Sequence, residues 1–229
     1  MVFTVSEAEF QFLRVFFELP QLAGFEALPT LEELTGLAKS LEGLVQKEYL
    51  HQDEEGKYFL EDELNFLLSV MKQADSAYVI EGRRKRFAAY FKEDAIVLFI
   101  MDEACQIMWL PFLPYLIGAT ASFLNPFLNS ETKELEGCTW EELDEVRKKW
   151  GESGYEKEWT FTFFQNGVKR IERIFEIYSN GTQQLLFRQE GEHIFVSAPN
   201  KADCVNAVTE VVARLHGNAI QKGENYERN

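Results

Sequence analysis

The stretch SAYVIEGRRKRFAAYFKEDAIVLFIMDEACQIMW, residues 76–109, decides the fold class predicted for this chain. Its side chains follow a period of two, which is typical of β-strands. Strands are predicted at residues 76–81, 84–91, 95–101 and 105–109. The turns between them, Lys92-Glu93-Asp94 and Asp102-Glu103 among them, are short. Because short turns connect antiparallel neighbours, the stretch predicts an antiparallel meander.

A second meander is predicted in the last third of the chain. Its strands are predicted at residues 158–164, 168–178, 182–188 and 193–197. The turns contain Asn166-Gly167, Asn180-Gly181 and Glu190-Gly191, which are strong hairpin signals.

Helices are predicted before, between and after the meanders. Two capping boxes, Ser6-Glu7-Ala8-Glu9 and Thr30-Leu31-Glu32-Glu33, mark the first two helices. The first is expected to end at Pro20, and a third follows Leu60. Further helices are expected at residues 116–128, at 139–150 and from 199 onward. The apolar residues assigned to these helices are Phe10, Leu13 and Phe17, then Leu34, Leu37, Leu41, Leu44 and Val45, then Leu64, Phe66, Leu67 and Val70, and finally Val205, Val208, Val212 and Leu215.

These elements predict an α+β fold. We expect a quasi-two-fold pair of antiparallel four-stranded meanders that form a central sheet flanked by helical bundles, because this packing buries both apolar faces. Residues 1–216 are predicted to form one domain. Its halves are residues 1–128, beginning with a helical unit at 1–75 that resembles a winged helix in outline, and residues 139–216. A polar tail is expected at 217–229.

The composition indicates a soluble cytoplasmic protein. The 229 residues carry a formal net charge of -15, which works against binding to nucleic acid or an anionic membrane. Three widely spaced cysteines fit reduced thiols better than a disulfide framework. The first ten residues, MVFTVSEAEF, show no export signal.

Motifs that would carry catalysis or metal binding are missing from the sequence. The three histidines lie far apart with no Cys or carboxylate at ligand spacing, so no metal is expected. Nucleophile-elbow, phosphate-loop and metalloprotease motifs are also missing. No cofactor is therefore expected.

The run IMWLPFLPYLIG, residues 107–118, is uncharged although the chain is acidic. It is too short to span a membrane and contains Pro111 and Pro114, so we predict no membrane insertion. We interpret it as a strand end that turns into a helix. Aromatic residues gather here and further along the chain, and core packing explains most of them. The alternative is an apolar groove for a partner.

The order of these pieces resembles the EspG family of type VII (ESX) secretion chaperones, and especially short relatives such as EsaE in systems that export LXG toxins. The segments that carry the resemblance are FTVSEAEFQFLRVFFELPQL at residues 3–22, FLEDELNFLLSVMKQAD at 59–75, WLPFLP at 109–114 and the terminal hairpin, strand and helix at 174–215. Phe195 stands where the family has tryptophan, whereas Pro199 and Asp203 match. The resemblance covers residues 1–216 and is a pattern of elements, without an invariant motif.

This resemblance implies a non-enzymatic cytosolic chaperone. Its partner would be a helical-hairpin secretion substrate of the LXG or WXG type, which it would pass to the secretion ATPase or membrane machinery. A sheet face flanked by helices can accept such a hairpin in a groove. The expected partner-binding residues are Trp109, Phe112, Leu113, Phe123, Phe127, Ile174 and Tyr178. By strand alternation, Ile174 and Tyr178 share a face with Glu172 and Glu176, and this mixed surface is more typical of binding than of a core.

Two alternatives remain. A winged-helix regulator of transcription is favoured by residues 1–75 and by the basic cluster Arg83-Arg84-Lys85-Arg86. Against it, residues 1–80 contain five Lys or Arg and fifteen Asp or Glu, which would repel phosphate. An enzymatic or small-molecule-binding domain would need convergent polar groups in a pocket, and the sequence does not display them.

Overall fold

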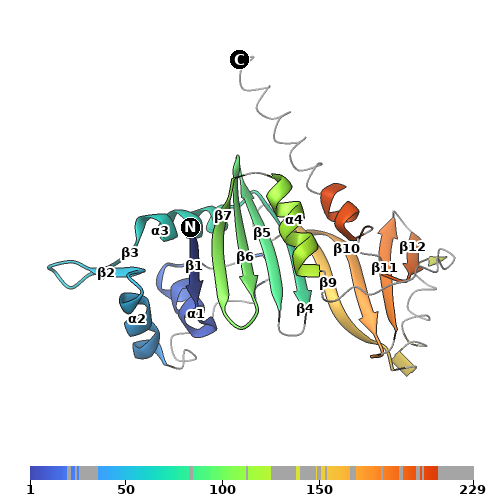
Figure 1. Cartoon of the computed structure of the whole chain (residues 1–229), viewed down its shortest axis with the longest axis horizontal. Helices are drawn as coiled ribbons and strands as arrows, with labels where there is room; N and C mark the ends of the chain where they lie inside the picture. Colours follow the sequence, from blue (N-terminus) through green and yellow to red (C-terminus); the bar gives the residue numbers. More distant parts are fainter. Residues whose placement is uncertain are drawn as a thin grey trace, which may run out of the picture. The chain divides into compact units, whose positions relative to one another are not determined.

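The computed structural model divides into two compact units, whose helices and strands are labelled in Figure 1. Unit 1 comprises Met1–Val79, Arg84–Phe112 and Phe164–Arg170, and unit 2 comprises Ile80–Arg83, Leu113–Phe163 and Ile171–Asn229. The structure describes residues 1–19, 22–23, 25, 36–82, 85–111, 113–124, 138–139, 148, 151–152, 154–165, 169–181, 183–190, 193–199, 202 and 204–210.

Unit 1 combines helices with a sheet and a separate hairpin. Its elements are β1 (Val2–Val5), α1 (Glu7–Phe16), α2 (Leu37–Gln46), β2 (Leu50–Gln52), β3 (Tyr58–Leu60), α3 (Asp62–Lys72), the start of β4 (Ser76–Gly82), β5 (Arg86–Lys92), β6 (Ala95–Met101) and β7 (Cys105–Leu110). The sheet order is β1-β7-β6-β5-β4, and β2 pairs with β3 alone. The strands predicted at residues 76–109 are therefore confirmed, with bounds that differ by at most two residues.

Strand β1 was not predicted from the sequence. It lies antiparallel to β7, from Val2 opposite Met108 to Val5 opposite Cys105. The backbone N–H of Thr4 donates to the Tyr49 hydroxyl over 3.2 Å, and the Tyr49 ring meets Phe3 edge-on at 5.1 Å. Tyr49 therefore covers part of the outer edge of β1, which would otherwise offer a free N–H to another chain.

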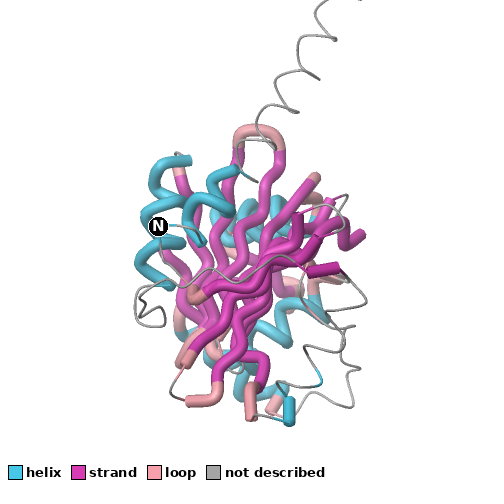
Figure 2. The backbone as a smooth tube through the Cα atoms, turned by 90° about the vertical axis from the view of Figure 1, so that its right-hand side faces the viewer, coloured by secondary structure: helices cyan, strands magenta, loops and turns pink. Residues whose placement is uncertain are grey.

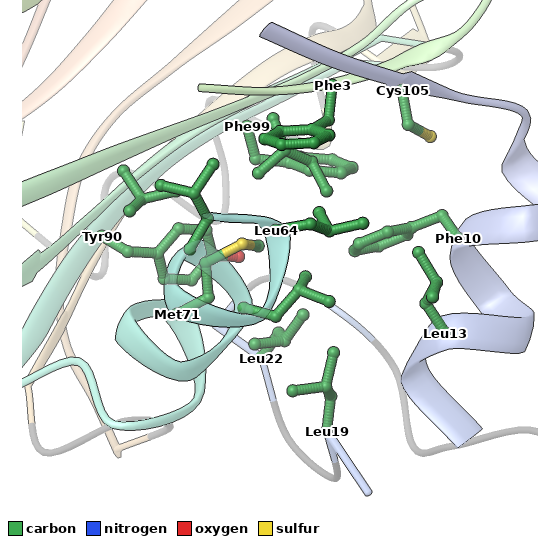
Figure 3. Close-up of a cluster of buried hydrophobic side chains, with 14 of the residues drawn as sticks. Phe3, Phe10, Leu13, Leu19, Leu22, Leu64, Met71, Tyr90, Phe99 and Cys105 are labelled. Atoms are coloured by element: carbon green, nitrogen blue, oxygen red, sulfur yellow. The ribbon is translucent and has the colours of Figure 1, made fainter. Parts of the chain in front are cut away.

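The core of unit 1 lies between one face of this sheet and the helices α1 and α3 (Figure 3). Phe10 of α1 packs against Phe99 of β6, with ring centroids 4.6 Å apart. The Tyr90 hydroxyl donates to the backbone carbonyl of Ala23 over 3.0 Å, so a buried polar group is satisfied inside the core. The core side chains labelled in Figure 3 are Phe3, Phe10, Leu13, Leu19, Leu22, Leu64, Met71, Tyr90, Phe99 and Cys105.

The first capping box is confirmed. The Glu9 backbone N–H donates to Ser6 Oγ over 3.2 Å, and the Ser6 N–H donates to Glu9 Oε2 over 2.6 Å. Helix α1 ends at Phe16, before Pro20. Phe10 and Leu13 are buried, as expected for the stripe that faces the sheet.

The second helix differs from the prediction. Helix α2 begins at Leu37 after Gly36, which adopts a positive φ of 79° and provides no side-chain cap. The box at residues 30–33 and Leu34 lie outside the described residues. Leu44 is buried, but Leu37 and Val45 are exposed. Position 45 follows position 44 by about 100° around the helix, so the two cannot both face the core centre.

Unit 2 contains the second meander. Its described elements are residues 80–82 of β4, α4 (Leu113–Leu124), β8 (Cys138–Thr139), β9 (Glu156–Gln165), β10 (Lys169–Ser179), β11 (Gln184–Glu190) and β12 (His193–Ser197). The sheet order from β4 is β9-β10-β11-β12-β8. The four predicted strands are confirmed, and the fold class is α+β with an antiparallel sheet flanked by helices (Figure 2). The quasi-two-fold relation and the single domain at 1–216 stay predictions.

Helix positions in unit 2 shift from those expected. Helix α4 begins at Leu113, three residues early, because Pro114 fits the first turn, where its missing N–H leaves no bond unmade. Thr139, expected to start a helix, ends the short strand β8 opposite His193. Residues 140–147 lie outside the described part. In the last helix Val208 is buried and Val205 half-buried, whereas positions 212 and 215 are not described.

Candidate functional site

Trp109, in unit 1, is the most exposed aromatic among the predicted binding residues whose side chains are described. Its side chain is 51% exposed, although Val97, the residue of β6 that pairs with it, is fully buried. Strand β1 stops pairing at Met108, so no β1 residue lies beside Trp109. An exposed tryptophan at a sheet edge is a good anchor for a partner, because its burial on binding removes a large apolar area from water.

Phe123, in unit 2, is part of a packed aromatic contact. It is half-buried on α4 and meets the Trp159 ring of β9 edge-on, with centroids 5.7 Å apart. Trp159 in turn lies against Gly82 of β4, where an added Cβ would fall 2.5 Å from the indole. Phe123 therefore contributes to the fold of unit 2 and offers a partner only part of its ring.

Tyr178, on β10, belongs to a covered surface. Its ring packs against Phe187 with centroids 4.7 Å apart, and its hydroxyl donates to Glu176 Oε2 over 3.1 Å. Glu176 is only 2% exposed, and Lys157 Nζ lies 3.6 Å from its Oε1. Glu176 is therefore a buried carboxylate on this face, and a lysine and a hydroxyl compensate its charge.

The remaining predicted residues fall outside what the structure describes in full. Phe112 and Phe127 lie outside the described residues. Leu113 begins α4 and Ile174 lies within β10, but their side chains are not described. Trp109 lies in unit 1, whereas Phe123 and Tyr178 lie in unit 2, where each contacts an aromatic outside the predicted set.

Helix α4 adds a surface that sequence reasoning missed. It buries Leu116, Thr120 and Leu124 and contains no charged residue. Its opposite side exposes Tyr115, at 60%, with Gly118 and Ser122. The signal in the sequence is the uncharged run at 107–118, which predicts a strand end that turns into a helix and does not single out Tyr115. A helix side that carries no charge and exposes an aromatic ring to water is typical of a binding element.

An open pocket of about 370 Å³ lies in unit 2 near the β10–β11 turn, lined by Gly154, Glu156, Glu158, Ser179, Asn180 and Gly181. Its polar groups already bond within the unit. Glu158 accepts from Gln184 Nε2 over 3.0 Å, and Asn180 Oδ1 accepts from the Gln183 N–H over 2.8 Å. The Asn180 bond closes the β10–β11 turn, and the Glu158 bond links β9 to β11.

The described half of the basic cluster packs within unit 1. Lys85 Nζ lies 2.6 Å from Asp102 Oδ2, and the Arg86 guanidinium lies 4.3 Å from the centroid of the Phe25 ring. Arg83 and Arg84 lie outside the described residues. Both described side chains thus already interact within unit 1, one in an ion pair and the other in a cation–π contact. This weakens the interpretation of the cluster as a nucleic-acid contact.

The described residues provide neither a cluster of metal ligands nor a membrane-spanning helix. No group of three His, Cys, Asp or Glu side chains among them is placed to hold a metal ion. None of their helices is long and apolar enough to cross a membrane.

Comparison with known proteins shows a likeness in structure. No family model matches the sequence, and no curated protein matches it either. Among solved structures, the type VII secretion system chaperone EspG5 of Mycobacterium tuberculosis, in complex with the PE25–PPE41 dimer, matches with a TM-score of 0.62 and 10% sequence identity. The match covers 93% of this chain and 96% of EspG5.

The fold is EspG-like. At 10% identity the match rests on the arrangement of elements, as the resemblance in sequence did. The EspG-like fold here includes both meanders and the helices that precede and follow them.

Proposed function

We propose that this chain is a non-enzymatic cytosolic chaperone of a type VII secretion system. It binds a helical-hairpin substrate of the LXG or WXG type and keeps it soluble until the secretion ATPase or membrane machinery receives it. The observation that carries this proposal is the likeness to EspG5 over nearly the full length of both chains, because that chaperone was solved bound to a PE25–PPE41 dimer.

The exposed apolar side chains suit such a partner. Trp109 in unit 1 and the Tyr115 side of α4 in unit 2 each expose aromatic surface with no charge on the same element nearby. Gly118 has open space where a side chain would be, so a helix can approach the α4 backbone closely. An amphipathic helix that covers the Tyr115 side of α4 would bury apolar surface on both partners. The proposed contacts are Trp109, Phe112, Leu113, Phe123, Phe127, Ile174 and Tyr178, with Tyr115 added.

The first experiment is native affinity purification from the host, followed by mass spectrometry and circular dichroism of the co-purifying protein. We expect a stoichiometric, helix-rich partner that carries an LXG or WXG motif. Recovery of DNA, or of no protein partner at any salt concentration, would contradict the proposal and return the winged-helix regulator to consideration.

The second experiment locates the contact. Trp109→Glu and Tyr115→Glu each place a charge on an exposed side chain, so the fold should persist while partner retention falls by about tenfold or more. Val45→Glu, also on an exposed apolar residue but outside the proposed set, is the matched control and should retain the partner. Equal retention by all three variants would show that the partner binds elsewhere.

A further inference from the structure

The β2–β3 hairpin of unit 1 has one buried and one exposed face. Leu50 and Leu60 pair across the strands and are buried in the core. The next pair, His51 and Phe59, points away from the core, with ring centroids 5.7 Å apart. Phe59 is 46% exposed, so the hairpin offers an aromatic ring to solvent.

Helix α3 follows the hairpin directly (Figure 1) and carries a second exposed phenylalanine. It buries Leu64, Leu67 and Met71 and leaves Phe66 53% exposed. Asp62 and Glu63 precede Phe66 by four and three residues, so all three are neighbours on the same outer side of the helix. Two exposed rings therefore lie on one continuous hairpin and helix.

The segment that carries these two rings is acidic. Residues 50–73 contain six acidic and two basic side chains. Asp53 Oδ1 accepts the backbone N–H groups of Glu55 and Lys57, and Glu61 Oε2 caps α3 by accepting the Leu64 N–H. Both of these carboxylates are used to shape the segment.

Four further carboxylates have no such role. Glu54, Glu55, Asp62 and Glu63 are exposed, and none of them forms an ion pair with another described residue. Their charges remain available to a partner, apart from the weak attraction of Asp62 and Glu63 to the start of α3.

The segment is also held in one conformation. The Asp53 N–H donates to the Lys57 carbonyl, the Gly56 N–H to the Asp53 carbonyl, and the Glu61 N–H to the Tyr49 carbonyl, each over 3.0 Å. Gly56 has a φ of 82°, which glycine adopts without strain. Binding to a preformed surface loses less conformational entropy than binding that must order a loop.

We propose that this hairpin–helix surface, defined by Glu54, Glu55, Phe59, Asp62, Glu63 and Phe66, binds a protein segment that combines Lys or Arg with apolar side chains. The carboxylates attract the cationic residues, and Phe59 and Phe66 supply the apolar contact. A nucleic acid or an anionic membrane would be repelled by the same carboxylates. The proposal does not depend on the chaperone function, because it rests on other residues and another class of contact.

The test uses a synthetic amphipathic peptide of Leu and Lys, about 18 residues long or about five helical turns. Its binding to the full chain is measured by fluorescence anisotropy at about 0.05 M and about 0.5 M salt, where electrostatic screening differs strongly. A peptide with Glu in place of Lys serves as the negative probe. We expect the Lys peptide to bind, with an affinity that falls as salt rises, and the Glu peptide not to bind.

Two pairs of charge variants separate this surface from general attraction to an acidic protein. Glu55→Lys with Glu63→Lys should raise the Kd of the Lys peptide by about tenfold or more. Asp94→Lys with Glu103→Lys changes the net charge equally at exposed turns of the meander, and should change the Kd by less than about twofold. Equal effects of the two pairs would overturn the proposal.

The aromatic contribution is tested at constant charge. Phe59→Ser with Phe66→Ser leaves the carboxylates in place and, at two exposed positions, should leave the thermal unfolding midpoint unchanged. We expect the Kd of the Lys peptide to rise by about tenfold. An unchanged Kd would show that the two rings take no part in binding and would overturn the proposal.

Discussion

The carboxylate of Glu9 lies 2.6 Å from Lys47 Nζ and fills the space beside Gly43. Glu9 is in the first turn of α1, whereas Gly43 and Lys47 lie at the end of α2, so one side chain both caps its own helix and holds the next. Because Glu9 is buried and Lys47 half in water, the pair is partly shielded from solvent.

The first prediction concerns Glu9 and acid. Burial raises the pKa of the Glu9 carboxyl, but hydrogen bonds from Lys47 and Ser6, with the Lys47 charge, outweigh burial and leave the pKa below its ordinary value of 4.5. A lowered folded pKa means that the carboxylate stabilises the fold above the unfolded pKa, and that this stabilisation is lost as pH falls through the folded pKa. Glu9→Gln should therefore lower the free energy of unfolding at pH 7 by about 1 kcal/mol.

Urea unfolding at pH 7 and pH 3 measures this effect. The loss of stability on acidification should be smaller for Glu9→Gln than for the wild type. Glu7→Gln, which removes an exposed carboxylate from the same turn, is the matched control for the loss of one charge. A Glu9→Gln variant with the wild-type acid response would show that Glu9 is not coupled to folding.

The second prediction concerns Gly43. Alanine in a helix interior is normally favoured over glycine by about 1 kcal/mol. At Gly43, however, the new Cβ would collide with the Glu9 carboxylate, which Ser6 and Lys47 hold in place. We expect Gly43→Ala to destabilise the wild type and to stabilise the Glu9→Ala variant. A double-mutant cycle measured by urea unfolding tests this, and additive effects would refute it.

The third prediction compares two glycines of unit 2. A Cβ at Gly82 would lie 2.5 Å from the Trp159 ring, so Gly82→Ala should lower the free energy of unfolding by about 1–3 kcal/mol. At Gly118, on the exposed side of α4, an added Cβ would meet no other atom within 4 Å. Gly118→Ala should therefore raise the free energy of unfolding by up to about 1 kcal/mol. Unfolding followed by tryptophan fluorescence gives both values. The prediction fails if the two changes have the same sign.

The fourth prediction concerns the Tyr49 hydroxyl. Tyr49→Phe removes the acceptor of the Thr4 N–H and should cost about 1 kcal/mol of stability. It should also speed hydrogen exchange at the Thr4 amide. Tyr58→Phe is a suitable control, because Tyr58 is half-buried in the same unit and its hydroxyl has no hydrogen bond to a described residue. Unchanged exchange at Thr4 would show that the hydroxyl does not protect β1.

The fifth prediction concerns alkaline pH. Burial, followed by the negative charge of Glu7, raises the pKa of the Cys105 thiol to about 12. A raised folded pKa means that stability is fully present below the unfolded pKa, near 9, and is lost as pH rises toward 12. Between these values the wild type should lose up to about 1.4 kcal/mol per pH unit more than Cys105→Ala. Urea unfolding from pH 8.5 to 10.5 measures the two slopes, and parallel slopes would contradict the assignment.

Both meanders were predictable because their signals are local. The alternation of apolar and polar residues identifies each strand. A turn of only a few residues makes the next strand its antiparallel neighbour. Strand β1 was not predicted, because Val2 and Val5 pair with Met108 and Cys105, about a hundred residues away. The four residues VFTV contain no local signal that specifies so distant a strand. The capping box at Ser6 and Glu9 succeeded for the opposite reason, since its bonds span three residues.

Exposure was predicted less well than secondary structure. The apolar period of α3 correctly selected Leu64 and Leu67 but also included Phe66, because periodicity alone does not set which side of a helix meets the sheet. On β10, alternation placed Glu176 beside Tyr178 correctly, yet the carboxylate is buried. Its compensation comes from Lys157 on another strand, which no local pattern reveals.

The pairing of β1 with β7 also constrains how the chain can fold during synthesis. Val2–Val5 leaves the ribosome about a hundred residues before Cys105 and its neighbours. At a synthesis rate of about 5–20 residues per second, roughly 5–20 s pass between the synthesis of α1 and that of the sheet that covers Phe10 and Leu13. During that interval the nascent apolar helix is open to aggregation. The protein that we propose to shield apolar helices therefore passes through a stage in which it needs such shielding itself.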